Sequence, residues 1–178
     1  VAGFGPQVQV RGIRGASCMI FLAVGTIMPF DRLVRAVDEA IDARLINTPV
    51  FAQIGQTKLK PKNMEYASVL TKDEFDRKVT EAEFLISHAG IGSITMAGER
   101  GKRLIVMPRL KRYGEHVNDH QVATARQFGA LGHILVANGA DELFRKLREV
   151  GSFAPVPRMC QPDRVAHRIS QLLQSIDD

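Results

Sequence analysis

Short apolar segments alternate with amphipathic segments along most of this chain, and this alternation limits the folds open to it. The apolar segments end at glycine, proline or polar residues, as buried strands do. Strands are expected at 19–24, 50–54, 68–70, 84–87, 104–107 and 133–136. Since helical segments separate them, the sequence predicts an α/β fold, a Rossmann-like parallel sheet with helices on both faces.

The helical segments have recognisable starts. After the first strand, apolar residues from Phe30 to Ile41 recur at helical spacing, and Pro29 is expected in the first turn of this helix. Thr71, with Glu74 three residues later, predicts a capping box for a second helix. Further helices are expected at about 93–100, 116–128, 141–150 and 163–176.

Composition indicates one folded domain preceded by an extension. Residues 1–18 contain several glycines and no periodicity, so a flexible extension is expected there and the folded domain at 19–178. The apolar run from Met19 follows two arginines and so imitates a signal peptide, but it continues into an amphipathic helix. Cys18 and Cys160 lie far apart in the sequence, which argues against a disulfide framework and a zinc ribbon.

The chain is basic, with a formal net charge of +5. A basic protein could bind nucleic acid, but the lysines and arginines of this chain are dispersed along the sequence. The aromatic residues are nine phenylalanines and two tyrosines, mostly phenylalanine at apolar positions, rather than a basic and aromatic stripe. Anionic substrates or an acidic membrane surface explain the charge equally well.

The segment 84–93 runs from an apolar strand through a glycine-rich turn into a helix. Gly90 and Gly92 leave the backbone open to a diphosphate, and the first N–H groups of the helix are free donors at the positive end of its dipole. His88 and Ser93 add donors. A simple tight turn would also explain the glycines; no Gly-Lys-Ser/Thr follows, and the third glycine of the dinucleotide fingerprint is missing.

A second polar segment, 114–121, concentrates hydrogen-bonding residues around one valine. Asp119, His120 and Gln121 are suited to the hydroxyl groups of a sugar, because carboxylates accept hydrogen bonds and amides both donate and accept. The alternative is an ordinary solvated first turn of a helix. A zinc site is a weaker alternative: His116 and His120 are four residues apart, but Val117 stands where the zincin pattern has glutamate.

Each of these groups follows an expected strand: Gly25 and Thr26, Gly55, the segment 88–93, and the segment 109–121. Ligands of open parallel sheets bind beyond the carboxyl ends of the strands. The sequence therefore predicts that these groups meet at one edge of the sheet.

Taken in order, several motifs resemble the carboxyl-terminal domains of glycosyltransferase family 28, over nearly all of residues 19–175. These motifs are Val24 to Thr26, Gln53 to Gly55, His88 to Ser93, Gly101-Lys102 and Asn118 to Gln121. Within the family, Met107 to Arg109 and 114–125 are similar to the small, donor-binding subunits of split bacterial exopolysaccharide glycosyltransferases of the glucuronosyltransferase type. Those subunits are related to the small subunit of the dolichol-linked UDP-GlcNAc transferase.

The resemblance implies the carboxyl-terminal half of a GT-B enzyme, the half that binds the nucleotide sugar. The implied reaction is inverting transfer of a sugar, with glucuronate the first choice, from a UDP-sugar to a lipid-linked saccharide during exopolysaccharide assembly. No cofactor and no obligatory metal are expected. The partner implied is a membrane-associated subunit that supplies the acceptor lobe, which would place the protein in the cytoplasm at the inner face of the plasma membrane. Nucleic acid is not expected as a partner.

The resemblance also implies roles for individual residues. The diphosphate would be held by His88, Ala89, Gly90, Gly92 and Ser93, near Gly25, Thr26 and Gly55. Sugar hydroxyls would be bound by Asn118, Asp119, His120 and Gln121, and an acidic sugar or a lipid phosphate by Arg109. His116 and Glu115 are candidate general bases, a group on the partner being equally open.

One position departs from the family pattern. Met96 stands three residues after Ser93, where many members carry a glutamate that binds the ribose, and Glu99 does not take over that role because it lies a further turn along. Two rival functions stay open: a nucleotide-binding or partner-binding module without catalysis, and, less favoured, a nucleic-acid binder.

Overall fold

The computed structural model describes residues 19–157. The predicted flexible extension at 1–18, the predicted helix at 163–176 and both cysteines lie outside the described residues.

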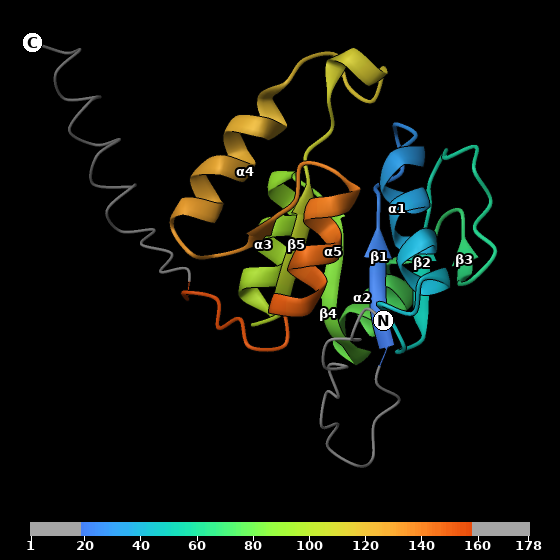
Figure 1. The fold of residues 1–178 in the computed structure, drawn as a ribbon, viewed down its shortest axis with the longest axis horizontal. Helices are drawn as coiled ribbons and strands as arrows, with labels where there is room; N and C mark the ends of the chain where they lie inside the picture. The colour runs from blue at the N-terminus through green and yellow to red at the C-terminus, as the bar shows by residue number, and fades with distance from the viewer. Residues whose placement is uncertain (1–18, 158–178) are drawn as a thin grey trace, which may run out of the picture.

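The described chain forms a six-stranded sheet in which every pair of neighbouring strands is parallel (Figure 1). The strand order is β3-β2-β1-β4-β5-β6. The strands are β1 (Met19–Ala23), β2 (Val50–Gln53), β3 (Glu65–Ala67), β4 (Ala82–His88), β5 (Arg103–Met107) and β6 (Leu135–Val136). The register places Phe21 beside both Phe51 and Leu85. The predicted parallel α/β sheet is thus confirmed.

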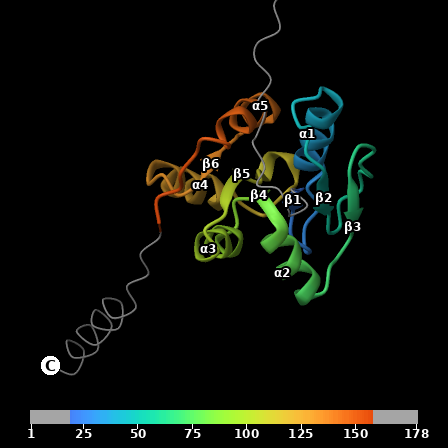
Figure 2. The ribbon, with the colours of Figure 1, turned by 90° about the horizontal axis from the view of Figure 1, so that it is seen from below.

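Helices cover both faces of this sheet. They are α1 (Asp31–Asp42), α2 (Lys72–Glu81), α3 (Ile91–Glu99), α4 (His120–Ala130) and α5 (Ala140–Glu149), with a short 3₁₀ helix, η1 (Lys111–Tyr113). Figure 2 shows α1 and α5 on one side of the sheet, α2 and α3 on the other, and α4 beyond β5 near β6. Among the described helices, none is long and apolar enough to cross a bilayer.

The core is divided by the sheet into two apolar clusters. Alternate residues of β1 point to opposite faces, so Ile20 and Leu22 join the cluster under α1 and α5, whereas Phe21 joins the cluster under α2 and α3. Leu104 and Ile105 of β5 divide in the same way. Burial on both faces explains why the central strands are apolar throughout rather than alternating.

The predicted strand at 68–70 is wrong, because the edge strand β3 comes three residues earlier. Its residues Glu65 and Tyr66 are exposed and carry no apolar signal. Leu70 instead donates its N–H to the side-chain oxygen of Gln53 (3.1 Å) and leads into α2. The capping box of α2 is confirmed, since Thr71 and Glu74 bond each other's backbone N–H groups.

Helix α3 begins at Ile91, two residues before the predicted start, and two other helix starts also differ from expectation. The predicted helix at 116–128 begins only at His120. Residues 108–119 form a loop, called here the β5–α4 loop, in which the N–H groups of Leu110 and Lys111 bond the side chains of Glu115 and Asp119. Pro29 lies before α1 rather than in its first turn, and the capping residue is Phe30. The N–H of Phe30 donates to the side-chain oxygen of Thr57 (3.1 Å), a buried residue.

Candidate functional site

The predicted groups meet at the carboxyl edge of the sheet, at the top of Figure 1. A Cβ added to Gly25 would lie 3.3 Å from His88 Cε1 and 3.9 Å from Arg109 Nη2. At Gly55 an added Cβ would lie 2.2 Å from the carbonyl oxygen of Gly25. Groups that follow β1, β2, β4 and β5 are therefore in contact. From β1 the chain adds strands first on one side, β2 and β3, and then on the other, β4 to β6. The boundary between β1 and β4 is thus the topological switch point, where open α/β sheets bind ligands.

The turn between β4 and α3, residues 88–93, is shaped around the ring of His88. Gly90 caps α3 in an extended conformation, and a Cβ on it would lie 2.4 Å from His88 Nε2. Only glycine lets the imidazole lie this close to the turn. A Cβ on Gly92 would meet nothing within 4 Å, so the backbone there faces open space. Ala89 is fully buried beneath the turn.

The start of α3 is unusual in its electrostatics. Of the five described α-helices, α1, α2 and α5 carry acidic residues in the first turn, and α4 is preceded by Asp119. Helix α3 has no acidic residue there and no capping side chain. The positive end of its dipole, with the N–H groups of Ile91, Gly92 and Ser93, is thus not balanced locally and favours an anion.

Two serines extend this turn into the protein. The Ser87 hydroxyl lies 2.6 Å from the carbonyl oxygen of Ala23, to which it donates, and 3.0 Å from the hydroxyl of Ser93. Ser87 therefore ties the end of β4 to the end of β1 and fixes the position of Ser93 at the start of α3.

His88 is largely buried and lacks a positive charge at neutral pH. Burial lowers its pKa from 6.5 to about 4, and the nearby positive charge of Arg109 adds to the effect. The Nδ1 atom lies 3.3 Å from the Ser87 hydroxyl. A neutral imidazole can donate one hydrogen bond and accept another, so His88 can serve a ligand as a donor without adding charge.

His116 contributes a second imidazole from the β5–α4 loop. Its Nδ1 atom is buried without a hydrogen-bond partner among the described residues. Its ring packs edge-on against that of His120, with centroids 4.5 Å apart. The helical face that the zinc alternative requires is not formed, because His116 precedes α4. Within residues 19–157, no three His, Cys, Asp or Glu side chains gather as metal ligands would.

Three residues expected to contact the substrate make hydrogen bonds within the chain. Arg109 donates to the carbonyl oxygens of Pro29, Val24 and Glu115, and only 3% of it is exposed. Gln121, equally buried, accepts the N–H of Arg109 with its side-chain oxygen (3.1 Å). Glu115 is 6% exposed, and its carboxylate is bonded to Arg32. These polar atoms shape the site from inside.

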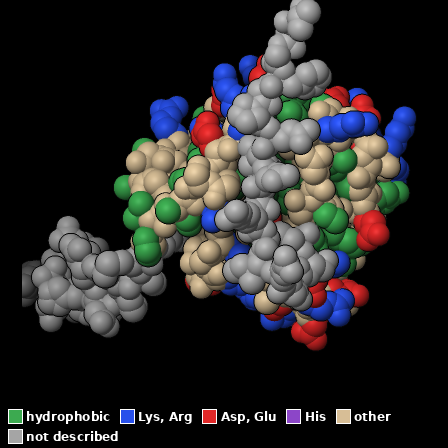
Figure 3. All heavy atoms as spheres, turned by 60° about the horizontal axis from the view of Figure 1, so that its bottom comes forward, with side chains coloured by type: hydrophobic (Ala, Val, Ile, Leu, Met, Phe, Trp, Pro, Cys, Tyr) green, Lys and Arg blue, Asp and Glu red, His purple; other side chains and the backbone are tan. Residues whose placement is uncertain are grey.

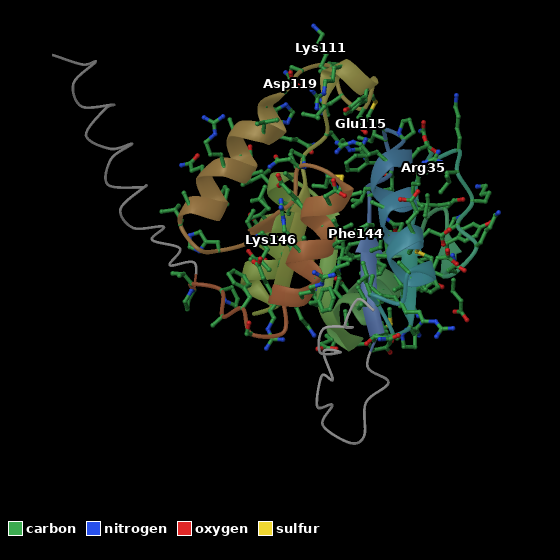
Figure 4. The ribbon with its side chains drawn as sticks, in the orientation of Figure 1. Arg35, Lys111, Glu115, Asp119, Phe144 and Lys146 are labelled. Carbon is green, nitrogen blue, oxygen red and sulfur yellow. The ribbon has the colours of Figure 1, made fainter. Side chains whose placement is uncertain are left out.

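The remaining predicted sugar-binding residues are exposed. Asn118 accepts hydrogen bonds from the backbone and ring of His120, and Asp119 accepts the N–H of Lys111 (2.8 Å). Figure 4 shows Lys111, Asp119 and Glu115 around η1 at the carboxyl edge of the sheet. Thr26 is exposed in the loop after β1, close to Gly55. Met96 is partly buried and packs against the core cluster under α2 and α3.

Arg32, the residue that holds Glu115, was not predicted from the sequence. It lies near the start of α1, 83 residues from its partner, where an arginine reads as ordinary surface charge. A buried carboxylate needs a cation, but the segment Gly114-Glu115-His116 does not itself show that Glu115 is buried, so the sequence carried no signal for Arg32.

The whole described domain matches a known family. Residues 19–163 match the glycosyltransferase family 28 C-terminal domain. The chain belongs to this family. The family 28 domain is 30% identical over 124 residues to the human UDP-N-acetylglucosamine transferase subunit ALG13, a match that covers 65% of this chain and 10% of the human protein. The mouse ALG13 protein matches at 30% over 123 residues. This family 28 domain therefore spans about a tenth of the length of these relatives.

Solved structures support the fold. The NMR structure of ALG13 matches with a TM-score of 0.59 and 19% identity, over 85% of this chain and 94% of that chain. The MurG structure from Acinetobacter baumannii matches with a TM-score of 0.54 and 20% identity, over 80% of this chain and 45% of MurG. The family 28 domain thus has the Rossmann-like fold of the carboxyl-terminal half of a GT-B glycosyltransferase, as predicted.

Proposed function

We propose that this domain binds the diphosphate of a UDP-sugar at the turn between β4 and α3 and is the donor-binding part of an inverting glycosyltransferase. The observation that carries the proposal is the start of α3, where unpaired N–H groups without local acidic residues lie beside His88 in a family 28 domain. Such a helix start is suited to phosphate.

The reaction requires stabilisation of the departing UDP. An acceptor hydroxyl attacks the anomeric carbon, the bond to the diphosphate oxygen breaks, and negative charge builds on that oxygen. The donors of α3 and His88 are fixed before the reaction and stabilise this charge without reorganising. On this proposal no obligatory metal is needed.

The general base is proposed to be His116 or a group on a second lobe. The Nδ1 atom of His116 is unpartnered among the described side chains, whereas the carboxylate of Glu115 is occupied by Arg32. His116 is therefore the better of the two candidates in this chain.

The donor sugar is proposed to be glucuronate, with N-acetylglucosamine or another hexose next. Arg109 is buried behind the site, so the cations available to a sugar carboxylate are Lys111 and Arg112 of η1, which are exposed. The acceptor is proposed to be a lipid-linked saccharide of exopolysaccharide assembly.

The acceptor lobe is proposed to belong to a separate, membrane-associated subunit. The human relative is named as a subunit, and the match covers nearly all of the solved ALG13 chain but less than half of MurG. Exposed apolar side chains at the carboxyl edge, those of Ile27, Ile91 and Val117, fit such an interface. The partner would hold this protein in the cytoplasm at the inner face of the plasma membrane.

Calorimetric titration with UDP, UDP-glucuronate, UDP-GlcNAc and ADP tests the proposal. We expect UDP to bind more tightly than ADP, and His88→Ala to weaken UDP binding by about tenfold, as loss of one hydrogen bond to a charged group does. The control is His133→Ala, since His133 lies outside the site and bonds the carbonyl oxygen of Val156. Equal affinity for UDP and ADP, or no effect of His88→Ala, would contradict the proposal.

A nucleotide-binding module without catalysis is favoured by one observation, the internal bonding of Gln121 and Glu115. Transfer of labelled sugar to lipid in the presence of the native membrane fraction separates the two functions. A nucleic-acid binder is less favoured: Figure 3 shows lysine and arginine side chains in separate groups on the lower face, several beside acidic ones.

A further inference from the structure

Arg32 holds Glu115 through a two-pronged ion pair. Its Nε donates to Glu115 Oε1 and its Nη2 to Glu115 Oε2, each at 2.8 Å. The guanidinium plane matches the carboxylate plane in this geometry, which is the strongest arrangement available to such a pair. Because the Glu115 side chain is 7% exposed, solvent screens the pair little.

The same guanidinium reaches two other segments. Nη2 donates to the carbonyl oxygen of Pro108 (2.8 Å), and Nη1 donates to that of Asn138 (3.0 Å). The charged group also lies over the rings of Phe30 and Tyr113, 5.3 Å and 5.2 Å from their centroids. One side chain of α1 thus joins the end of η1, Glu115 beyond it, the residue after β5 and the turn before α5.

Glu115 in turn makes hydrogen bonds to other residues of the β5–α4 loop. Its Oε2 also accepts the N–H of Leu110 (2.9 Å), and its backbone oxygen accepts from Arg109 (3.2 Å). One residue further, the N–H of Lys111 donates to Asp119 (2.8 Å). Side chains therefore provide most of the hydrogen bonds that give this loop its shape.

We infer that Arg32 is a positioning residue, which acts through Glu115 to hold the β5–α4 loop in the shape that presents His116, Asn118 and Asp119 at the site. The identity of the ligand rests on the proposed function, but the control of the loop does not. Without the guanidinium, the carboxylate of Glu115 would stay buried without its ion-pair partner, a costly state that movement of the loop toward solvent relieves.

Trypsin cleavage tests the control of the loop without any ligand, because Lys111 and Arg112 are exposed in η1. In Arg32→Met we expect cleavage after these two residues to become about tenfold faster, as local opening becomes cheaper. Cleavage at other sites, identified by mass spectrometry, should keep its wild-type rate. The control is Arg35→Met, which removes an exposed arginine of the same helix (Figure 4) and should cleave like wild type.

Ligand binding tests the consequence for the site. Arg32→Met should weaken UDP-glucuronate binding by about tenfold, since the loop faces the sugar, and leave UDP binding within about twofold, since α3 holds the diphosphate. Glu115→Gln should give the same selective loss, and the double variant should lose no more than either single variant. Glu115→Gln is the milder change, and it provides the same test if Arg32→Met does not fold.

Unchanged cleavage at Lys111 and Arg112, or faster cleavage at all sites alike, would overturn the role of Arg32. Equal weakening of UDP and UDP-glucuronate would overturn it as well, because a general loss of structure has that effect. If the wild-type protein binds no uridine nucleotide, the proposed function fails, and the trypsin comparison still decides whether Arg32 holds the loop.

Discussion

Individual residues of the site divide into those that the sequence could reveal and those that it could not. His88, Gly90 and Gly92 form a local pattern, a strand followed by a glycine turn, and the structure places them together. The bond between Arg32 and Glu115 joins residues 83 positions apart. No spacing rule connects them, so the sequence could not show that Glu115 points inward.

His88 shows how burial controls chemistry at the scale of one residue. Its pKa is about 4 in the folded protein against an ordinary value of 6.5, because burial and Arg109 both oppose the charged form. Between these values the unfolded chain binds more protons than the folded one. Folding is therefore favoured by neutral His88 above pH 6.5, and this contribution is lost as the pH falls through about 4.

We predict that the free energy of unfolding rises by up to about 3 kcal/mol between pH 4 and pH 6.5 through His88 alone. Urea denaturation of wild type and His88→Gln across this range measures the contribution as the difference between the two pH profiles. NMR titration of the His88 ring should give a midpoint near 4. A midpoint near 6.5, or two parallel stability profiles, would contradict the burial argument.

At the scale of elements, features encoded by neighbouring residues were predicted correctly, whereas the edge strand β3 and the start of α4 were not. The capping box of α2 lies within four residues, and it was predicted correctly. Strand β3 pairs with one neighbour only, β2, and is largely exposed. Its residues therefore lack the apolar pattern by which a buried strand is recognised in the sequence. The start of α4 was misplaced because its polar residues bond across the β5–α4 loop, a tertiary feature.

Gly90, which caps α3, and Gly92, in its first turn, should respond to alanine in opposite ways. Gly90→Ala would bring a Cβ to 2.4 Å from His88 Nε2, so the ring must move, at a cost of about 1–3 kcal/mol. Gly92→Ala meets nothing within 4 Å, and alanine favours the helix by up to about 1 kcal/mol. Melting temperatures of both variants check this, and equal shifts would show that the His88 contact does not control the turn.

At the scale of the whole molecule, two core clusters share one sheet. Leu104 and Ile105 are neighbours on β5, yet they pack on opposite faces. The sequence predicted a core on each face of the sheet, because its strand segments are apolar throughout and so lack a polar face. The clusters should therefore lose stability together.

We predict that Leu104→Ala and Ile105→Ala each lower the free energy of unfolding by about 2–5 kcal/mol, in one cooperative transition. Amide hydrogen exchange should become faster across the whole sheet in both variants. It should also become faster in α1 and α5 when Leu104 is changed, although Leu104 packs on the other face. Faster exchange confined to α2 and α3 would show instead that the faces unfold separately.

The hydrogen bonds that shape the β5–α4 loop all join groups of this chain. If the proposed ligand binds there, ordering the loop should cost it little free energy, and we expect its association rate to be set by diffusion and orientation rather than by closure of the loop. Variants of the loop that stay ordered will then differ mainly in how long the ligand remains bound. Variants that disorder the loop will also slow its arrival.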